Sequence, residues 1–363
     1  MLVAYVSGHG YGHATRVAEV LRVVRERDPR LGITVVTSAP ASLFHGVIAE
    51  PLDVRALECD VGLVQKDALT VDEAATAQQW REFHAANGDR VDAEWRWLHH
   101  AGARVILGDV PPLAFEAAAE VGVPSIALAN FSWDWIYRHL AREQAALAAA
   151  ASWAASAYAR AGLLLRLPFA GDLSAFPKAV DIPLVARRPR VARGESRRLL
   201  GLGAGPVALV SFGGIGVGSF ALRVLAGVAE VQFVAVGLPG PAPSNVRLVS
   251  AAEMAGLGLR YEDVVGAADV VVTKPGYGIV SDAIGAGVRV VYTDRGDFPE
   301  YPILVAEMVR YVPAAYVSNQ DLMMGKLREP IRAVLAQPLP PPPDLSGAPA
   351  AAEWLLETAA RSA

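Results

Sequence analysis

Short apolar runs alternate with longer amphipathic stretches through the first half of the chain. The first run, at residues 2–6, leads into a turn rich in glycine and histidine, and apolar residues then recur at helical spacing until Pro29. Three more apolar runs follow at residues 33–37, 105–107 and 125–128. Strands that alternate with helices in this way predict a parallel sheet covered by helices.

The same order of strand, glycine turn and helix begins again after residue 206. An apolar strand is predicted at residues 207–212, followed by Gly213, Gly214 and a helix at residues 220–228. Later strands are predicted at residues 231–236, 270–273 and 288–292. The segment between the halves, residues 181–206, is rich in proline, glycine and arginine, which is typical of a linker.

This repeat predicts an α/β protein made of two doubly wound, Rossmann-like domains that face a central cleft. We expect the first domain at residues 1–185 and the second at residues 186–345. The alanine-rich residues 141–160 predict one packing helix. Prolines at residues 338–343 predict an extended connector to a last helix at 350–360, and we expect the segment 346–363 to pack back on the first domain.

Composition narrows the class of protein. A chain of 363 residues exceeds the ~250 to 300 residues that one core usually serves. The net charge of −4 provides no cationic field, so no nucleic-acid partner is expected. The single cysteine, Cys59, rules out an internal disulfide. Neither a leader-like segment nor an apolar run of ~20 residues is present, so we expect a cytoplasmic protein without a membrane span.

The turn after the first strand carries the first candidate chemistry. Gly10 and Gly12 let a ligand approach the backbone, and the helix that follows offers free N–H groups. His13 lies at this corner, where a neutral imidazole can accept a proton from a hydroxyl. Asp109 follows an apolar strand and can orient His13 or bind a substrate hydroxyl. The alternatives are that His13 only bonds the turn or caps the helix, and that Asp109 is a turn residue.

A second candidate cradle follows the strand at residues 270–273. Lys274 stands before the turn Gly276, Tyr277 and Gly278, and a helix is predicted to follow. A diphosphate at this turn would meet N–H donors, the positive end of the helix dipole and a cation. Asp282, near the start of that helix, can accept hydrogen bonds from a ribose or compensate the dipole.

Three other groups of residues are open to more than one interpretation. Asp297 and Glu300 follow the strand at 288–292, where they suit recognition of sugar hydroxyls or form a solvated loop. Trp133 can stack on a sugar face or belong to a core. The six arginines of residues 187–198 can hold phosphate or be solvated surface. Histidines, cysteine and carboxylates show no metal-ligand spacing, so no catalytic metal is expected.

Several segments resemble the GT-B glycosyltransferases, particularly the bacterial cell-wall N-acetylglucosaminyltransferases and, more closely, the glycosyltransferase-like N-terminal module of plant L-arabinokinases. They are Cys59-Asp60 through Gln65, Lys66 and Asp67 to Asp72, then Asn130-Phe131-Ser132-Trp133-Asp134, Pro183 to Arg187, and Lys274 to Ala283. The segment with Trp133 and the Lys-Pro-Gly-Tyr-Gly motif are specific, and the resemblance covers nearly the whole chain.

The resemblance implies a GT-B fold with an acceptor-binding first domain, a nucleotide-sugar-binding second domain, and transfer that needs neither a metal nor a cofactor. His13 takes the place of the family's base or acceptor ligand. The turns at Gly213-Gly214 and 276–278 take the place of the glycine turns at the donor diphosphate.

Other site residues are implied by the same resemblance. Asp282 takes the place of the acid on the ribose, where many relatives carry glutamate. Asp297 or Glu300 takes the place of the group near the donor sugar. The remaining candidates for substrate contact are Gly10, Gly12, Gln65, Asp67, Trp133 and Asp134.

The predicted function is transfer of a hexosyl or pentosyl group from a nucleoside diphosphate sugar, such as a UDP-sugar, to a hydroxyl acceptor with inversion. Two alternatives stay open, because a fold does not determine chemistry. One is a nucleotide-sugar epimerase or hydrolase, and the other is a non-catalytic module that binds a nucleotide sugar. Arabinokinases continue into a separate kinase domain that this sequence does not contain, so kinase activity is not expected.

Overall fold

The computed structural model describes residues 1–65, 71–212, 220–238 and 240–362. The strands in the first half are β1 (Leu2–Val6), β2 (Ile33–Thr37), β3 (Asp53–Ala56), β4 (Val105–Asp109), β5 (Ser125–Ala129), β6 (Leu163–Arg166) and β7 (Ala179–Asp181). Those in the second half are β8 (Val207–Ser211), β9 (Gln232–Val236), β10 (Val246–Val249), β11 (Val270–Thr273), β12 (Arg289–Tyr292) and β13 (Ala314–Tyr316).

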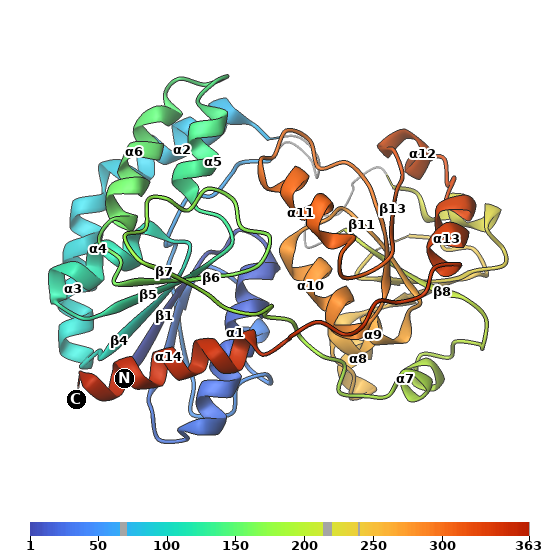
Figure 1. Ribbon diagram of the computed structural model, residues 1–363, viewed down its shortest axis with the longest axis horizontal. Coiled ribbons are helices and arrows are strands. Elements are labelled where there is room, and N and C mark those ends of the chain that lie inside the picture. Colours follow the sequence, from blue (N-terminus) through green and yellow to red (C-terminus); the bar gives the residue numbers. More distant parts are fainter. Residues whose placement is uncertain (66–70, 213–219, 239, 363) are drawn as a thin grey trace.

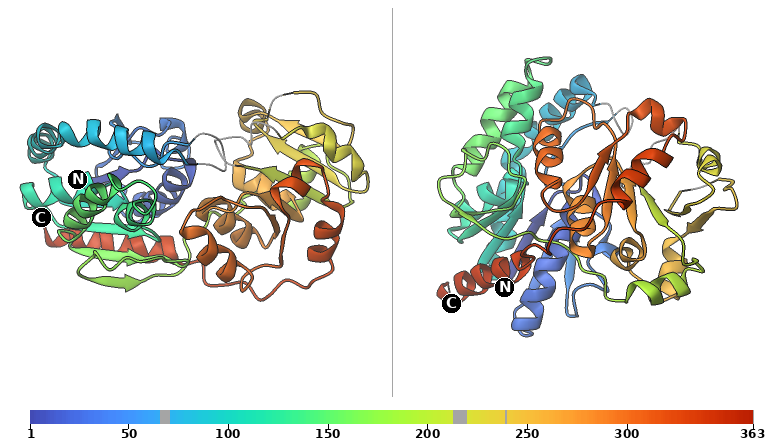
Figure 2. Two further views of the ribbon diagram at one scale, coloured as in Figure 1. Left: turned by 90° about the horizontal axis from the view of Figure 1, so that it is seen from above. Right: turned by 45° about the vertical axis from the view of Figure 1, so that its right-hand side comes forward.

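The strands form two parallel sheets that lie side by side in two domains (Figures 1 and 2). The first sheet has the order β3-β2-β1-β4-β5-β6-β7, and the second has the order β10-β9-β8-β11-β12-β13. In each sheet the first strand of that half, β1 or β8, lies in the interior, and the strand numbers increase toward both edges. This is the doubly wound arrangement. The prediction of an α/β fold with two such domains is confirmed.

Helices cover the sheets. Around the first sheet lie α1 (Tyr11–Arg27), α2 (Glu73–Ala85), α3 (Asn87–Ala101), α4 (Pro112–Val121), α5 (Trp133–Leu140), α6 (Leu147–Tyr158) and α14 (Gly347–Arg361). Around the second lie α7 (Arg193–Leu199), α8 (Ala251–Gly256), α9 (Tyr261–Ala267), α10 (Tyr277–Ala286), α11 (Glu300–Met308), α12 (Asn319–Met323) and α13 (Arg328–Leu335). Short 3-10 helices are η1 (Ala41–Leu43) and η2 (Leu222–Gly227). Among the described residues, none of these helices has the length and apolar character needed to cross a bilayer.

Strand β1 shows how the first sheet is buried on both faces. Leu2, Ala4 and Val6 pack in the layer that contains α1 and α14, whereas Val3 and Tyr5 pack in the opposite layer with α3, α4 and α6. Successive side chains of a strand point to opposite faces, so an uninterrupted apolar run is what a central strand of a covered parallel sheet requires.

Two helix predictions need correction. The packing helix predicted at residues 141–160 is α6, which spans only Leu147–Tyr158, and α5 ends just before the predicted range at Leu140. Leu140 and Leu147 are both buried in the same core, so the chain reverses between them and α6 packs against α5. Residues 220–228 hold only η2, and the Asn245 amide donates to the carbonyls of Leu225 and of Val228, the residue after η2, where the chain leaves the helical turn.

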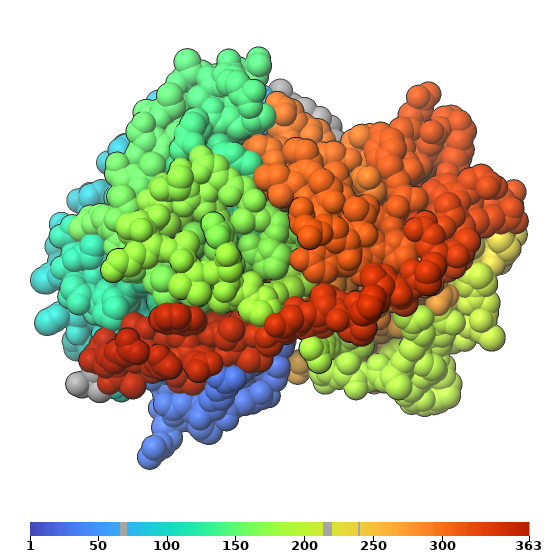
Figure 3. All heavy atoms as spheres, in the orientation of Figure 1, coloured from blue at the N-terminus to red at the C-terminus, as the bar shows by residue number. Residues whose placement is uncertain are grey.

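The C-terminal helix α14 lies against α1 of the first domain (Figures 1 and 3). The proline-rich stretch before it runs from the second domain to the first, and Leu355 of α14 is fully buried there. Gly347, at the start of α14, touches the linker, since a Cβ at this position would lie 2.1 Å from the carbonyl oxygen of Pro183. The chain therefore crosses between the domains twice, once in each direction.

Candidate functional site

The two glycine turns predicted from the sequence meet at the domain interface. Gly10 has a φ of 92° and precedes α1, a conformation that glycine adopts without strain. Gly12, in the first turn of α1, faces Gly278 of α10, and a Cβ on Gly278 would lie 3.0 Å from the Gly12 Cα. A Cβ on Gly12 would be in ordinary van der Waals contact with the Gly278 backbone at 3.6 Å, so the close approach of α1 to α10 depends mainly on Gly278.

His13 and Asp109 lie together beside this contact. Asp109 is the last residue of β4, and His13 follows Gly12 on α1, so the carboxyl edge of the first sheet brings them together. The His13 Nδ1 is 2.9 Å from Asp109 Oδ1. Both side chains are buried, with exposures of 10% and 0%. Val110, directly after Asp109, has a φ of 77°, which costs a β-branched residue energy and is typical of constrained sites.

Arg16 is a further member of this cluster that the sequence analysis did not identify. Its Nε and Nη2 donate to the two oxygens of Asp109 at 2.9 and 2.6 Å, and its Nη1 donates to Asn130 Oδ1 at 2.9 Å. The guanidinium also lies over the Tyr277 ring of α10, 4.7 Å from its centroid. The only signal in the sequence was its position three residues after His13, on the same face of α1.

The polar cluster continues into the second domain through Asn130. This residue follows β5, and its Nδ2 donates to Glu300 Oε1 at 2.6 Å. The other oxygen of Glu300 accepts from Arg295 Nη1 at 2.7 Å. Glu300 is therefore at the interface, as a sugar contact would require, but both of its oxygens are occupied by protein groups and its exposure is only 2%.

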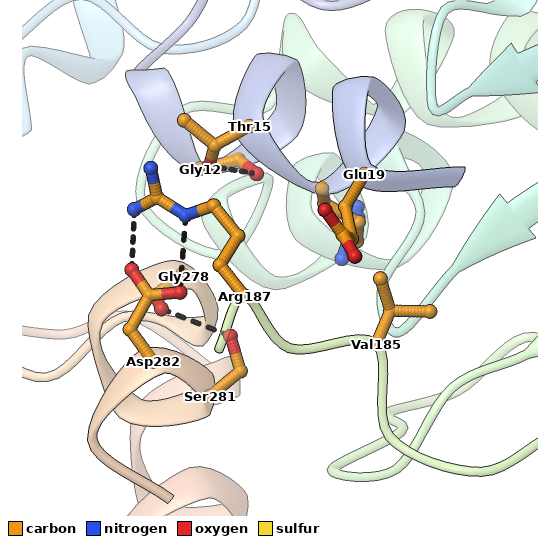
Figure 4. Close-up of a pocket in the computed structure, with 9 residues that line it drawn as sticks. Gly12, Thr15, Glu19, Val185, Arg187, Gly278, Ser281 and Asp282 are labelled. Carbon is orange, nitrogen blue, oxygen red and sulfur yellow. Dashed lines mark hydrogen bonds and ion pairs between the residues drawn. The ribbon is translucent and has the colours of Figure 1, made fainter. Parts of the chain in front are cut away.

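The turn at the start of α10 faces the first domain. Gly276 precedes α10, Tyr277 is its first residue, and Lys274 stands between β11 and the turn. Asp282 lies one turn further along and is buried. It accepts two hydrogen bonds from Arg187 of the linker (Figure 4). Arg187 also donates to Glu262. The predicted ribose contact of Asp282 is thus occupied by an arginine in this structure.

The space between α1, α10 and the linker is nearly closed (Figure 4). It is lined by Gly12, Thr15, Arg16, Glu19, Val185, Arg187, Gly278, Ser281 and Asp282. Its volume of about 10 Å³ holds no more than one water molecule. This space is too small to hold a nucleotide sugar in this structure.

Of the two interpretations of Trp133, the structure supports the core residue and not the sugar-stacking surface. Its exposure is 3%, its ring stacks on Tyr137 and its Nε1 donates to Asp60 Oδ2 at 2.7 Å. Asp134 is also buried and accepts from Ser132 and Arg138, so it serves the start of α5 instead of facing a substrate. His9 contacts Asp60 as well, through Nε2 and the Asp60 carbonyl at 3.2 Å.

Other predicted residues lie elsewhere. Asp297 is exposed and accepts from His139 of α5, which is a second contact between the domains. Gln65 is exposed and pairs with Val71 in an isolated bridge. Gly213, Gly214 and Asp67 lie outside the described residues.

The arginine-rich linker pairs mainly with carboxylates. Arg190 bonds Asp263, and Arg193 and Arg197 bond Asp269, all in the second domain. These arginines therefore fasten the linker to the second domain. Arg190 and Arg193 are also exposed, at 43% and 40%, so the interpretation of the run as surface holds for them, whereas Arg197 is only 15% exposed. No cluster of three or more histidine, cysteine, aspartate or glutamate side chains suited to a metal occurs in the described part of the chain.

Comparison with known proteins identifies the fold. No family model matches the chain. An L-arabinokinase from Arabidopsis thaliana is 34% identical over 337 residues, which are 89% of this chain and 31% of that protein. This chain thus spans about a third of the length of the curated relative it matches.

Two solved plant structures share the architecture at low identity. UGT2 of Phytolacca americana, complexed with UDP-2-fluoro-glucose and pterostilbene, gives a TM-score of 0.62 at 14% identity, covering 99% of this chain and 94% of its own. A UDP-glucosyltransferase from Polygonum tinctorium capable of glucosylating indoxyl gives 0.62 at 13% identity, with coverage of 99% and 94%. The chain has the GT-B fold, as the sequence predicted.

Proposed function

We propose that this chain is a glycosyltransferase that moves a sugar from a nucleoside diphosphate sugar to a hydroxyl acceptor. The observation that carries the proposal is the pairing of His13 with Asp109 directly beside the contact between Gly12 and Gly278. A candidate base and a helix N-terminus suited to a diphosphate thereby lie at one interface. UGT2, with the same fold, was solved with a UDP-sugar and a small acceptor.

His13 would act as the general base. Its Nδ1 faces the ionised Asp109, so Nδ1 carries the proton that it donates to the carboxylate, and Nε2 keeps its lone pair. Nε2 makes no hydrogen bond to any residue that the structure describes. The acceptor hydroxyl would give its proton to Nε2 while its oxygen attacks the anomeric carbon of the donor.

The bond between the anomeric carbon and the diphosphate oxygen breaks as the new bond forms, and the electron pair leaves with the diphosphate. The free N–H groups at the start of α10 and the adjacent Lys274 would stabilise that negative charge. One displacement from the opposite face inverts the anomeric carbon. We therefore propose an inverting transfer without a required metal, and the donor acts as a substrate without a separate cofactor.

A thermal-shift screen followed by a transfer assay tests this function. Nucleoside diphosphates and their sugars that bind the folded state raise the melting temperature by mass action. Donors that do so are then incubated with sugars, polyols and phenols, with and without EDTA. We expect a product of inverted configuration at equal rates in both buffers. Nucleotide release or sugar isomerisation without an acceptor would instead support a hydrolase or epimerase, and binding without turnover a non-catalytic module.

The variant His13→Ala tests the base. It should lower kcat by about 100-fold or more, the usual contribution of a positioned base, and leave donor affinity unchanged within threefold. His45→Ala is the matched control. His45 also pairs with a carboxylate, that of Glu50, but its side chain is exposed and does not belong to the cluster around Asp109. Loss of donor affinity with retained turnover in His13→Ala would exclude this role.

A further inference from the structure

Arg16 joins three groups that the proposed reaction needs in one arrangement. Its side chain is 3% exposed, its donors are shared between Asp109 and Asn130, and its Nη2 lies 3.3 Å from the His13 Nδ1. Asp109 and His13 belong to the candidate base, and Asn130 leads to the second domain. One buried guanidinium therefore contacts both the base and the path across the interface.

The path across the interface has a defined direction. Because Asn130 Oδ1 accepts from Arg16, its Nδ2 must point the other way, where it donates to Glu300. Glu300 is the first residue of α11, and Tyr277, which lies under the guanidinium, is the first residue of α10. Arg16 thus meets the first turns of two helices of the second domain, one directly and one through a single amide.

Only an arginine can make this set of contacts. Its planar fork has five N–H donors, so it can hold both oxygens of Asp109 and still reach Asn130. A lysine in the same place would keep the charge but could not span the two partners. The positive charge of Arg16 is also needed. Without it, the negative charge of Asp109 would act on His13 alone.

From these contacts we propose that Arg16 is a positioning residue that joins the His13–Asp109 base to the donor-binding domain, so that base and donor cradle are aligned only when the domains are closed. The proposal rests on the transferase function above and names a residue through which that site is assembled. The charged and titratable groups that face Arg16 from other elements are Asp109 on β4, Tyr277 on α10 and Glu300 on α11.

Two substitutions at Arg16 separate its charge from its shape. In Arg16→Met the carboxylate of Asp109 acts on His13 alone and favours the imidazolium, so the base becomes protonated at higher pH. The acidic limb of the kcat profile should move up by about one pH unit or more, the usual effect of a nearby charge. In Arg16→Lys the limb should stay in place while kcat falls at least tenfold. If Arg16 had only a structural role, neither variant would shift the acidic limb of the profile.

Arg25→Lys is the matched control. Arg25 is a buried arginine on the same helix whose donors go to the carbonyls of Pro29, Leu31 and Pro51, away from the second domain. We expect its kcat and pH profile to stay within twofold of the wild type. An Arg16→Met enzyme whose acidic limb does not move, or an Arg16→Lys enzyme as active as Arg25→Lys, would overturn the proposal.

A measurement without substrate keeps this test separate from that of the function. Hydrogen exchange of peptides covering the first turns of α10 and α11 reports whether a change on α1 loosens the second domain. Exchange in both should become at least threefold faster in Arg16→Met and Arg16→Lys, but not in Arg25→Lys. If no donor is turned over by any form, the transferase function fails while this exchange still decides whether Arg16 joins the domains. Unchanged exchange would refute the joining role even in an active enzyme.

Discussion

Two buried aspartates of the first domain have pKa shifts of opposite sign. Burial disfavours the charged form of Asp109, but the nearby Arg16 and His13 outweigh burial and the pKa is lowered. For Asp134, burial dominates over the bonds from Ser132 and Arg138, and the pKa is raised. The ionised form of Asp109 therefore stabilises the folded state, whereas the ionised form of Asp134 costs stability.

This difference predicts how the variants Asp109→Asn and Asp134→Asn respond to acid. The stabilisation from Asp109 is complete above the ordinary carboxyl pKa and is lost as the pH falls through the lower folded value. Its removal should flatten the dependence of unfolding free energy on pH below about pH 4, by up to about 1.4 kcal/mol per pH unit for one proton. Asp134→Asn should make the free energy of unfolding rise more steeply with pH, at and just above the ordinary carboxyl pKa.

Urea unfolding at a series of pH values measures both slopes. Asp109→Asn should also be less stable at neutral pH by about 3 kcal/mol, because Arg16 is left buried without its carboxylate partner. Equal acid slopes in the wild type and Asp109→Asn would show that Asp109 is not held ionised by its neighbours.

At the scale of elements, strands buried on both faces were predictable and edge strands were not. The run of β1 is apolar throughout and that of β11 is apolar up to Thr273, and both strands were predicted with their observed bounds. The edge strands β3 and β13 contain exposed or half-buried residues, so no apolar run marks them. Their pairing depends on a neighbouring strand, which a local pattern does not contain.

The same reason explains which parts of the site were predictable. His13 and Asp109 each follow a strand, so parallel topology alone indicated that they lie at one edge of the sheet. Arg16 looks like an ordinary polar position of an amphipathic helix, and only the second domain buries it. The partner of Asp282 is Arg187, 95 residues earlier in the chain, and no spacing rule connects them.

The packing of helix α14 against the first domain can be tested by substitution of its leucines. Leu355 is fully buried against the layer that contains α1, whereas its neighbour Leu356 is only partly buried. Leu355→Ala should lower the free energy of unfolding by about 2 to 5 kcal/mol, as cavities at buried leucines do. Leu356→Ala should cost clearly less. Urea unfolding compares the two, and equal losses would mean that α14 is not packed as described.

At the scale of the whole molecule, polar contacts tie the domains together around the glycine contact. Asn130 reaches Glu300, His139 reaches Asp297 and the Arg260 side chain reaches the carbonyl of Gly46. The chain crosses between the domains at the linker and again before α14. This arrangement holds α1 against α10 with a space of only about 10 Å³ between them and the linker.

The contact between Gly12 and Gly278 brings the backbones of α1 and α10 close together, and it gives a test of how the domains are held. In Gly278→Val, the Cβ alone would lie 3.0 Å from the Gly12 Cα, and two further methyl groups must also be placed. Because backbone atoms cannot yield as a flexible side chain does, we expect the domains to separate. Small-angle scattering should then show a larger radius of gyration, and transfer should be lost.

Gly88→Val is the matched control for this wedge. Gly88 lies on α3, and a Cβ there would have no atom within 4 Å, so the added bulk meets only solvent. The control should scatter as the wild type does and lose no helix stability, because glycine has a lower helix propensity than valine. If Gly278→Val keeps both the wild-type scattering and full activity, the close approach of α1 to α10 is not required, and the alignment of His13 with the α10 turn must arise from contacts elsewhere.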